Sequence, residues 1–416
     1  MSKYQRGSLK IPTGGVFRSL KFRDYRLLFI GQVISISGTV MQSMAFSWLV
    51  FTLSGSALNL GINIFLSALP TVLLVYQGGR IADRFSPRRI LLVTQSIALI
   101  LALVLFFCAR LELLSLPLLY TFTFLQGILD AVELPARQVL VRQSVPDKSY
   151  LVNALSLTTS LLHISRIAGP ALAAAVLALW GAAVCFLINA ISYLFSLYTI
   201  YLMRVPARAV TVGMDTSFRA IVGRVWRQPF LRAMMQLYVV MGLLGVQYLV
   251  ILPAFVQIEL HQNSAALGGL LAFSALGSLL ASLTLAAFAS VHRLAKSIGL
   301  AAVLFGLSLF AFAHSSTLGA ALAAALPLGV FQTLLMSGSS SLLQQLISDE
   351  RVRGRVLSLF TFLSMGTAAP GALLVGILAS AVGPAQALVI SGVACFFVGF
   401  NFVRATRCID ARKISI

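Results

Sequence analysis

The sequence predicts an all-α integral membrane protein with twelve transmembrane helices arranged as two six-helix pseudo-repeats. Three observations predict this fold: an unusually apolar composition, the number of long apolar runs, and an internal repeat near half the chain length. Of the 416 residues, 59% are hydrophobic and 10% are charged. A soluble globular protein carries about 25% charged residues, so the composition excludes an ordinary soluble domain.

The apolar runs give the number and order of the helices. A helix needs roughly 20 mostly apolar residues to cross a bilayer, and each predicted span ends where Gly, Pro or charged residues interrupt the run. The twelve runs cover residues 27–51, 58–79, 90–109, 116–134, 155–179, 182–203, 233–255, 267–289, 297–313, 318–340, 357–381 and 385–403.

A polar gap after the sixth run divides the chain. Residues 204–232 form a predicted cytoplasmic linker between an N-terminal bundle at 27–203 and a C-terminal bundle at 233–403. Residues 1–26 and 404–416 are a predicted N-terminal segment and tail. The first segment has no apolar core with a small-residue cleavage site, so no removable signal peptide is expected.

The basic residues predict the orientation, because Lys and Arg concentrate in cytoplasmic loops. With both termini in the cytoplasm, 29 of the 31 basic residues fall in cytoplasmic segments, and the two exceptions are Arg110 and Arg166. The sequence therefore predicts a multi-pass protein of the bacterial cytoplasmic membrane, with both termini inside. The net charge of +20 is scattered between apolar runs and forms no single basic face, so nucleic acid is not an expected partner.

The two halves share short segments at a constant offset of 202 residues. Gln143 to Asp147 matches Gln345 to Asp349, Leu155-Ser156-Leu157 recurs as Leu357-Ser358-Leu359, and Gly169 meets Gly371. Three coincidences in one register indicate duplication of a six-span unit. Parallel repeats of this kind are typical of transporters, whose substrate path lies between the halves.

A short charged stretch joins the second and third predicted spans. It runs from Gly78 to Arg89 and contains two glycines, one carboxylate, four arginines and Pro87. The glycines permit close backbone approach, and the carboxylate of Asp83 is suited to capping helix ends or pairing with arginine. We expect a turn between two packed helices, with Asp83 as a conformational clamp and no substrate ligand.

This stretch resembles the loop motif of the major facilitator superfamily of secondary transporters. The motif is carried by Gly79, Asp83, Arg84, Arg88 and Arg89. The resemblance is to the branch that contains siderophore exporters and macrolide or multidrug efflux pumps. It implies alternating access, a proton gradient as the energy source with no cofactor, a small amphipathic substrate, and a functional monomer.

Further segments carry the same resemblance. They are Phe22 to Arg26, Asp130 with Pro135 to Gln138, and a run that includes Gly169-Pro170. The last is similar to the glycine–proline motif of antiporting exporters, and it implies a helix bend in span five. Residues 290–296, where the second half would repeat the charged turn, contain no acidic residue. We therefore expect the conformational contact to depend on the first half.

Four charged residues lie in or beside apolar runs, where ionisable groups are costly and tend to face a wet cavity. Asp130, Glu133 and Arg137 share one face of span four, and Arg166 lies deep in span five. We predict a proton-coupling network, with Asp130 as the leading partner of Arg166. The alternative is structural: Glu133 and Arg137 form a solvated helix-end pair and Asp130 is a buried anchor.

Other polar and aromatic side chains are candidates for a substrate cavity, because an apolar pocket with a few polar groups suits an amphipathic ligand. Taken one by one, such residues also serve as hydrogen-bonding contacts between helices. The candidates are Gln32, Gln42, Trp48, Gln126, Tyr238, Gln247 and Tyr248, together with Asn63, Asn189 and Gln332.

Three functions follow in order of preference. The first is a proton-coupled exporter of amphipathic small molecules, and the second is a proton-coupled importer of the same fold, which the direction of substrate movement would distinguish. The third is a membrane-embedded enzyme. The sequence contains no HExxH, GxSxG or P-loop motif and its four cysteines have no metal-ligand spacing, so we predict no catalytic residues and no metal site.

Overall fold

The computed structural model describes residues 17–205, 223, 226, 228–285, 291–346 and 350–406, and these contain helices and no strands. Within the helices, the side chains of Asp83, Arg166 and Pro170 are among those outside the description. The first half comprises η1 (Arg18–Lys21), α1 (Arg23–Ser54), α2 (Ala57–Arg84), α3 (Pro87–Arg110), α4 (Leu116–Gln143), η2 (Lys148–Tyr150) and α5 (Leu151–Tyr201). The second half comprises α7 (Pro229–Val240), η3 (Met241–Gly245), α8 (Tyr248–Ile258), α9 (Ser264–Leu285), α10 (Val291–Ala313), α11 (Leu318–Leu346), α12 (Glu350–Val382) and α13 (Pro384–Thr406).

These helices account for twelve spans and confirm the predicted fold class. α5 contains two spans that meet at Gly181, whose φ of 79° and ψ of 177° are not helical. α7, η3 and α8 follow one another as a single span, and η3 is a π-helical turn within it. Ten described segments are long and apolar enough to cross a membrane. α4 is not one of them, because Asp130 and Glu133 lower its mean hydropathy.

The structural repeat follows the sequence offset of 202 residues. Gly181 and Gly383 both have a positive φ, and each separates the last two spans of its half. A Cβ added to Gly169 would lie 2.6 Å from a Val40 methyl carbon, and one added to Gly371 would lie 2.6 Å from the carbonyl oxygen of Gly242. Gly371 and Gly242 of the second contact lie 202 positions after Gly169 and Val40 of the first. The same close contact between two spans therefore recurs in each half.

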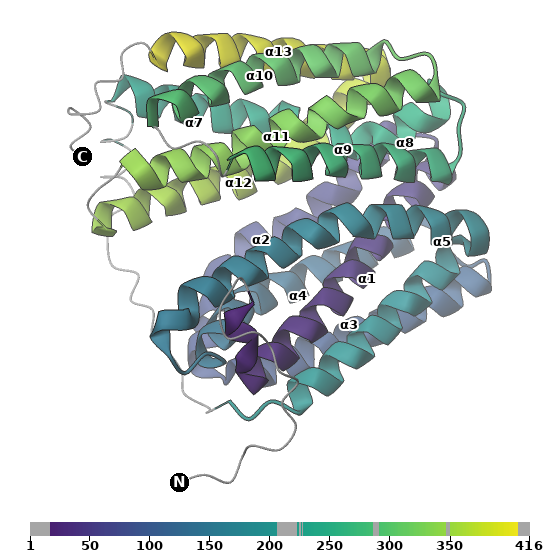
Figure 1. Ribbon diagram of the computed structural model, residues 1–416. Helices are drawn as coiled ribbons and strands as arrows, with labels where there is room; N and C mark the ends of the chain where they lie inside the picture. The colour runs from purple at the N-terminus through teal and green to yellow at the C-terminus, as the bar shows by residue number, and fades with distance from the viewer. Residues whose placement is uncertain are drawn as a thin grey trace. The chain divides into compact units, whose positions relative to one another are not determined.

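The chain folds into two compact units. The first combines residues up to Ala45 with Leu73–Leu114 and Phe124–Gly213, and the second combines Phe46–Val72, Ser115–Thr123 and the chain from Met214. In the first unit α3 packs along α5, and in the second α10 packs along α13 and α9 along α11 (Figure 1). The bundle boundaries predicted from the apolar runs stay a prediction.

The charged stretch between spans two and three is mostly helical. The sequence ends span two at Gly79, whereas α2 continues to Arg84 and α3 begins at Pro87. Only Phe85 and Ser86 separate the helices. Ser86 accepts a hydrogen bond from the backbone N–H of Arg89, which caps α3. An apolar run in the sequence marks only the part of a helix that lies in the hydrocarbon core of the bilayer. The helix itself can continue into the polar interface.

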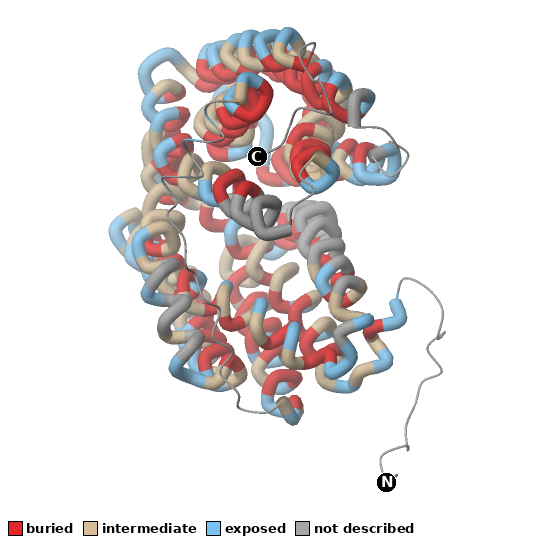
Figure 2. Tube along the Cα trace, turned by 90° about the vertical axis from the view of Figure 1, so that its left-hand side faces the viewer, coloured by how far each residue is buried: buried red, intermediate tan, exposed pale blue. Residues whose placement is uncertain are grey.

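The helices place buried and exposed residues in alternating patches along their length (Figure 2). Many exposed side chains are large and apolar, including Leu179 at 69%, Leu283 at 67% and Phe397 at 64% exposed. A soluble monomer rarely exposes so many. Lipid-facing helices do, because the bilayer is itself apolar, so the surface agrees with a multi-pass membrane protein.

Close packing of α9 and α11 gives a stability prediction. A Cβ on Gly329 would overlap the carbonyl oxygen of Ser274, and one on Gly277 would overlap that of Leu326. Backbone atoms cannot move aside as the end of a flexible side chain can. Gly329→Ala is therefore expected to lower the thermal unfolding temperature of the purified protein. The cost is at least the roughly 1–3 kcal/mol typical of overpacking.

The control for this prediction lies on the same helix. Gly319 is exposed, and nothing lies within 4 Å of an added Cβ there. Gly319→Ala is therefore expected to leave the unfolding temperature unchanged or slightly higher, because alanine favours helix over glycine. Equal effects of the two substitutions would contradict the assigned contact.

Candidate coupling and substrate site

In the first unit, hydrogen bonds to the buried carboxylate of Glu133 join α3 to α4. Glu133 is 7% exposed. Its Oε1 accepts hydrogen bonds from Gln95 Nε2 at 2.8 Å and from Arg137 on the next turn, and its Oε2 accepts one from Thr94 Oγ1 at 3.0 Å. Three donors, one of them the positively charged Arg137, therefore surround the Glu133 carboxylate.

Asp130 lies one helical turn earlier and has a different environment. It is exposed, and among the described residues it receives one hydrogen bond, from Gln126 Nε2 to Oδ1 at 3.0 Å. A carboxylate facing lipid would be costly, so an ionised Asp130 in a membrane requires polar surroundings. Of the two carboxylates on this helix, Asp130 has fewer hydrogen-bond donors among the described residues.

Polar residues recur every four positions along α4. Gln126, Asp130, Gln138 and Arg142 follow this spacing, and Leu134 completes it. At about 3.6 residues per turn, each step of four lies one turn further and about 40° round the helix, so the series winds round α4. Asp130, Leu134, Gln138 and Arg142 are all exposed. The helix thus presents a polar stripe, in contrast to the apolar exposed residues of its neighbours.

The second half replaces the carboxylate with an amide. Gln332 on α11 stands 202 positions after Asp130, and its Oε1 accepts a hydrogen bond from Tyr248 at 3.4 Å. The same hydroxyl lies 3.0 Å from Ser274 Oγ. A neutral amide exchanges no proton at physiological pH. The carboxylate of the first half is thus replaced by a hydrogen-bonded amide in the second.

The polar candidates on α1 differ in their contacts. Gln42 Oε1 accepts a hydrogen bond from Asn189 Nδ2 at 2.7 Å, which joins α1 to the second part of α5. Gln32 is 4% exposed, and neither amide atom has a partner among the described residues. Trp48 is partly exposed. Gln42 is thus a contact between helices in this structure, whereas the buried amide of Gln32 is unsatisfied.

The candidates on span seven are buried and lie around its π-helical turn. Gln247 Nε2 donates to the carbonyl oxygen of Gly242 at 2.7 Å. The rings of Tyr238 and Phe360 meet edge-on with their centroids 5.0 Å apart. The Tyr238 hydroxyl lies 3.5 Å from the carbonyl oxygen of Met336. Tyr248 bonds to α9 and α11 as described above. Tyr238 and Tyr248 thus connect span seven to other helices, whereas Gln247 bonds within the span. Their role in a substrate cavity stays a prediction.

The remaining predicted residues lie partly outside the description. The side chains of Asp83, Arg166 and Pro170 are outside it, so neither the clamp nor the pairing of Arg166 with Asp130 is observed. Gly79 lies within α2, and Arg84 and Arg89 are exposed. Arg88 donates to the carbonyl oxygens of Ile200 and Tyr201, at 3.0 Å and 2.6 Å. It therefore caps the end of α5.

Sequence reasoning missed the partners of Glu133 and Gln42. Thr94 and Gln95 lie on α3 and Asn189 on α5, and no local spacing reports which residues of another helix face a given side chain. A polar pair such as Thr94-Gln95 in an otherwise apolar run is the one signal available, since buried polar groups require partners.

Comparison with known proteins identifies the family. A family model described as "Transmembrane secretion effector" matches residues 15–412. The chain belongs to this family, within the major facilitator superfamily. It is accordingly a multi-pass membrane transporter and not an enzyme.

Relatives agree with this assignment. The Staphyloferrin A transporter of Staphylococcus aureus is 27% identical over 391 residues, covering 92% of this chain and 95% of that protein. The solved structure of a bacterial homologue of the human lysosomal transporter Spinster matches with a TM-score of 0.73 at 14% identity, over 93% of this chain and 97% of that one. A bacterial homologue of the iron transporter ferroportin matches at 0.69 and 16%, over 92% and 98%. At these identities the solved structures show the fold alone.

Proposed function

We propose that this transporter exports siderophore-type or other amphipathic small molecules in exchange for protons, by alternating access. The difference between Asp130 and Glu133 carries the proton part of the proposal. An exposed carboxylate with one amide donor can exchange its proton, whereas its neighbour is fully engaged. The family's description as a secretion effector supports the direction, and the staphyloferrin A relative supports the class of cargo.

The proposed cycle uses Asp130 as the single exchangeable acid. A proton enters from the acidic outer side and neutralises Asp130, which lowers the cost of exposing this helix face to an apolar cavity. Cargo binding on the inner side favours release of the proton to the cytoplasm. The proposal places the protein as a monomer in the bacterial cytoplasmic membrane, with both termini in the cytoplasm, as the distribution of basic residues predicts.

Inside-out membrane vesicles test the direction and the coupling together. With an acidic interior, vesicles containing the protein are expected to accumulate staphyloferrin A or a macrolide, the two probes that represent the proposed cargo classes. Collapse of the gradient by a protonophore should abolish the accumulation. If neither probe accumulates in inside-out vesicles and one does in right-side-out vesicles, the protein is an importer.

The conformational role of Asp83 is a second part of the proposal. Asp83→Asn is expected to change the balance of inward-open and outward-open states, because it removes the one carboxylate of the arginine-rich stretch from Gly78 to Arg89. Accessibility of cysteine probes on both faces of the membrane measures the balance. Asp147→Asn, in the α4–α5 connection, is the control. Unchanged accessibility on both faces in Asp83→Asn would count against the clamp.

A further inference from the structure

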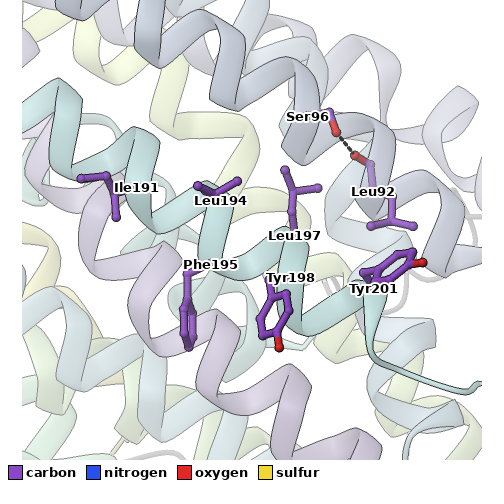
Figure 3. A pocket seen from close by; sticks show the side chains of 8 residues that line it. All are labelled: Leu92, Ser96, Ile191, Leu194, Phe195, Leu197, Tyr198 and Tyr201. Atoms are coloured by element: carbon purple, nitrogen blue, oxygen red, sulfur yellow. Dashed lines mark hydrogen bonds between the residues drawn. The ribbon is translucent and has the colours of Figure 1, made fainter.

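A groove runs between α3 and the second part of α5 on the surface of the first unit. Its volume is about 630 Å³. Leu92 and Ser96 of α3 line one side, and residues of α5 between Ile191 and Tyr201 line the other (Figure 3). The lining side chains are aliphatic or aromatic apart from Ser96, whose hydroxyl donates to the Leu92 carbonyl at 2.7 Å. The body of the groove therefore offers an apolar ligand contact area without unsatisfied polar groups.

The length of the groove matches half of a bilayer. Ile191 and Tyr201 are ten residues apart on a helix, which corresponds to about 15 Å at the usual rise per residue. The hydrocarbon core of a bilayer is about 30 Å thick. An acyl chain lying along this groove would therefore extend through about the thickness of one leaflet.

Basic groups gather at the Tyr201 end of the groove. Arg88 lies one turn before Leu92 on the same face of α3, and its guanidinium is 5.9 Å from the centre of the Tyr201 ring. Its two bonds to α5 carbonyls use two of five N–H groups. Arg23 donates to the carbonyl oxygen of Leu202 at 3.1 Å from α1. These side chains approach the last carbonyls of α5 from two different helices.

Among the described side chains at this end, arginines outnumber carboxylates. Arg204 follows shortly after the end of α5, and its backbone N–H donates to Asp24 Oδ1 at 3.2 Å. Asp24 also pairs with Arg23 at 3.4 Å. Within the described part, the Asp24 carboxylate thus stands against Arg23, Arg88 and Arg204. Tyr198 and Tyr201 are 60% and 69% exposed nearby, and tyrosine favours the membrane interface.

In the second unit, the helices equivalent to α3 and the second part of α5 are α10 and α13. α10 and α13 approach closely at glycines: an added Cβ on Gly306 would lie 2.5 Å from the Gly392 carbonyl oxygen, and one on Gly399 would lie 2.7 Å from the Ala302 Cβ. Leu197, which lines the groove, stands 202 positions before Gly399. The groove is therefore a feature in which the two repeats have diverged.

We propose that this groove binds one anionic phospholipid, with an acyl chain along α3 and α5 and the headgroup phosphate at Arg88, Arg23 and Arg204. Apolar lining explains the chain, and the excess of arginine explains preference for an anionic headgroup. The site is separate from the polar stripe of α4 and does not depend on the transported substrate.

Native mass spectrometry of the purified full-length protein tests the site, using nanodiscs with equal phosphatidylglycerol and phosphatidylcholine. The wild type is expected to retain one phosphatidylglycerol in preference to phosphatidylcholine. Arg88→Gln should reduce this retention about fivefold, the effect of one basic residue near an anionic lipid. Arg110→Gln is the matched control, because Arg110 is exposed at the opposite end of α3 and should leave retention unchanged.

A second variant keeps the test independent of the arginines. Leu194 lines the groove and is 58% exposed, so Leu194→Trp should fill the groove without disturbing a buried core. Loss of the bound lipid in Leu194→Trp, with an unchanged unfolding temperature, would support the proposal. Equal retention of both lipids by the wild type, retention unchanged in Leu194→Trp, or a dimer in place of a lipid-bound monomer would each overturn it.

Discussion

Asp130→Asn is expected to abolish proton-driven accumulation of cargo while leaving the protein folded in the membrane. The substitution keeps the size of the side chain and its capacity to accept from Gln126, but the amide cannot exchange a proton at physiological pH. Active transport should fall by at least tenfold, because removal of a required proton-transfer group typically costs about 10²–10⁴-fold. Substrate exchange without a gradient should persist, since that process requires only the movement of the two halves.

The matched control for this prediction is Asp147, which lies in the connection between α4 and α5. Asp147 is exposed, and hydrogen bonds from the hydroxyl and backbone N–H of Ser149 lower the pKa of its carboxyl. It therefore stays ionised at neutral pH and is no candidate for the exchangeable proton. Asp147→Asn should transport normally. Active transport by Asp130→Asn at the wild-type rate would refute the assignment.

Arg137→Gln has the largest expected effect on stability. Glu133 is buried and Arg137 supplies the positive charge beside it. Removing that charge leaves a buried carboxylate with the neutral donors Thr94 and Gln95. Breaking one partner of a buried ion pair typically costs about 3–5 kcal/mol. The unfolding temperature of Arg137→Gln should therefore fall well below that of the wild type.

A double substitution separates charge burial from packing. Glu133→Gln combined with Arg137→Gln leaves two neutral amides, so most of the lost stability should return. A double variant as unstable as Arg137→Gln alone would show that the buried charge is not the cause. Asp130→Asn is the comparison on the same helix, and it should change the unfolding temperature little, since Asp130 is exposed.

The fold followed from the sequence because bilayer-spanning helices are long and apolar. Gly181 and Gly383 stand where the predicted spans meet, and both adopt the positive φ that glycine tolerates. The π-helical turn of span seven at Met241–Gly245 was not predicted, because it has the same apolar residues as an α-helix. Helix ends were also misplaced: α2 and α4 extend beyond the apolar runs, to Arg84 and Gln143.

The candidate site was predictable only where its parts lie on one helix. The i, i+4 spacing of Glu133 and Arg137 placed them together, and the structure adds that Glu133 is buried while Arg137 is partly exposed. The contacts from Thr94 and Gln95 depend on how α3 faces α4, which a single sequence does not report. The difference between an engaged Glu133 and an open Asp130 therefore came from the packing of the helices.

The most direct test of the central claim measures protons released when cargo binds. In weakly buffered detergent solution, wild-type protein is expected to release protons on addition of the probe that it accumulates in the vesicle assay, because in the proposed cycle cargo binding displaces the proton from Asp130. Asp130→Asn should bind the same cargo and release none, while Asp147→Asn should behave as the wild type. Equal proton release by Asp130→Asn and the wild type would contradict the assignment of Asp130 as the proton carrier.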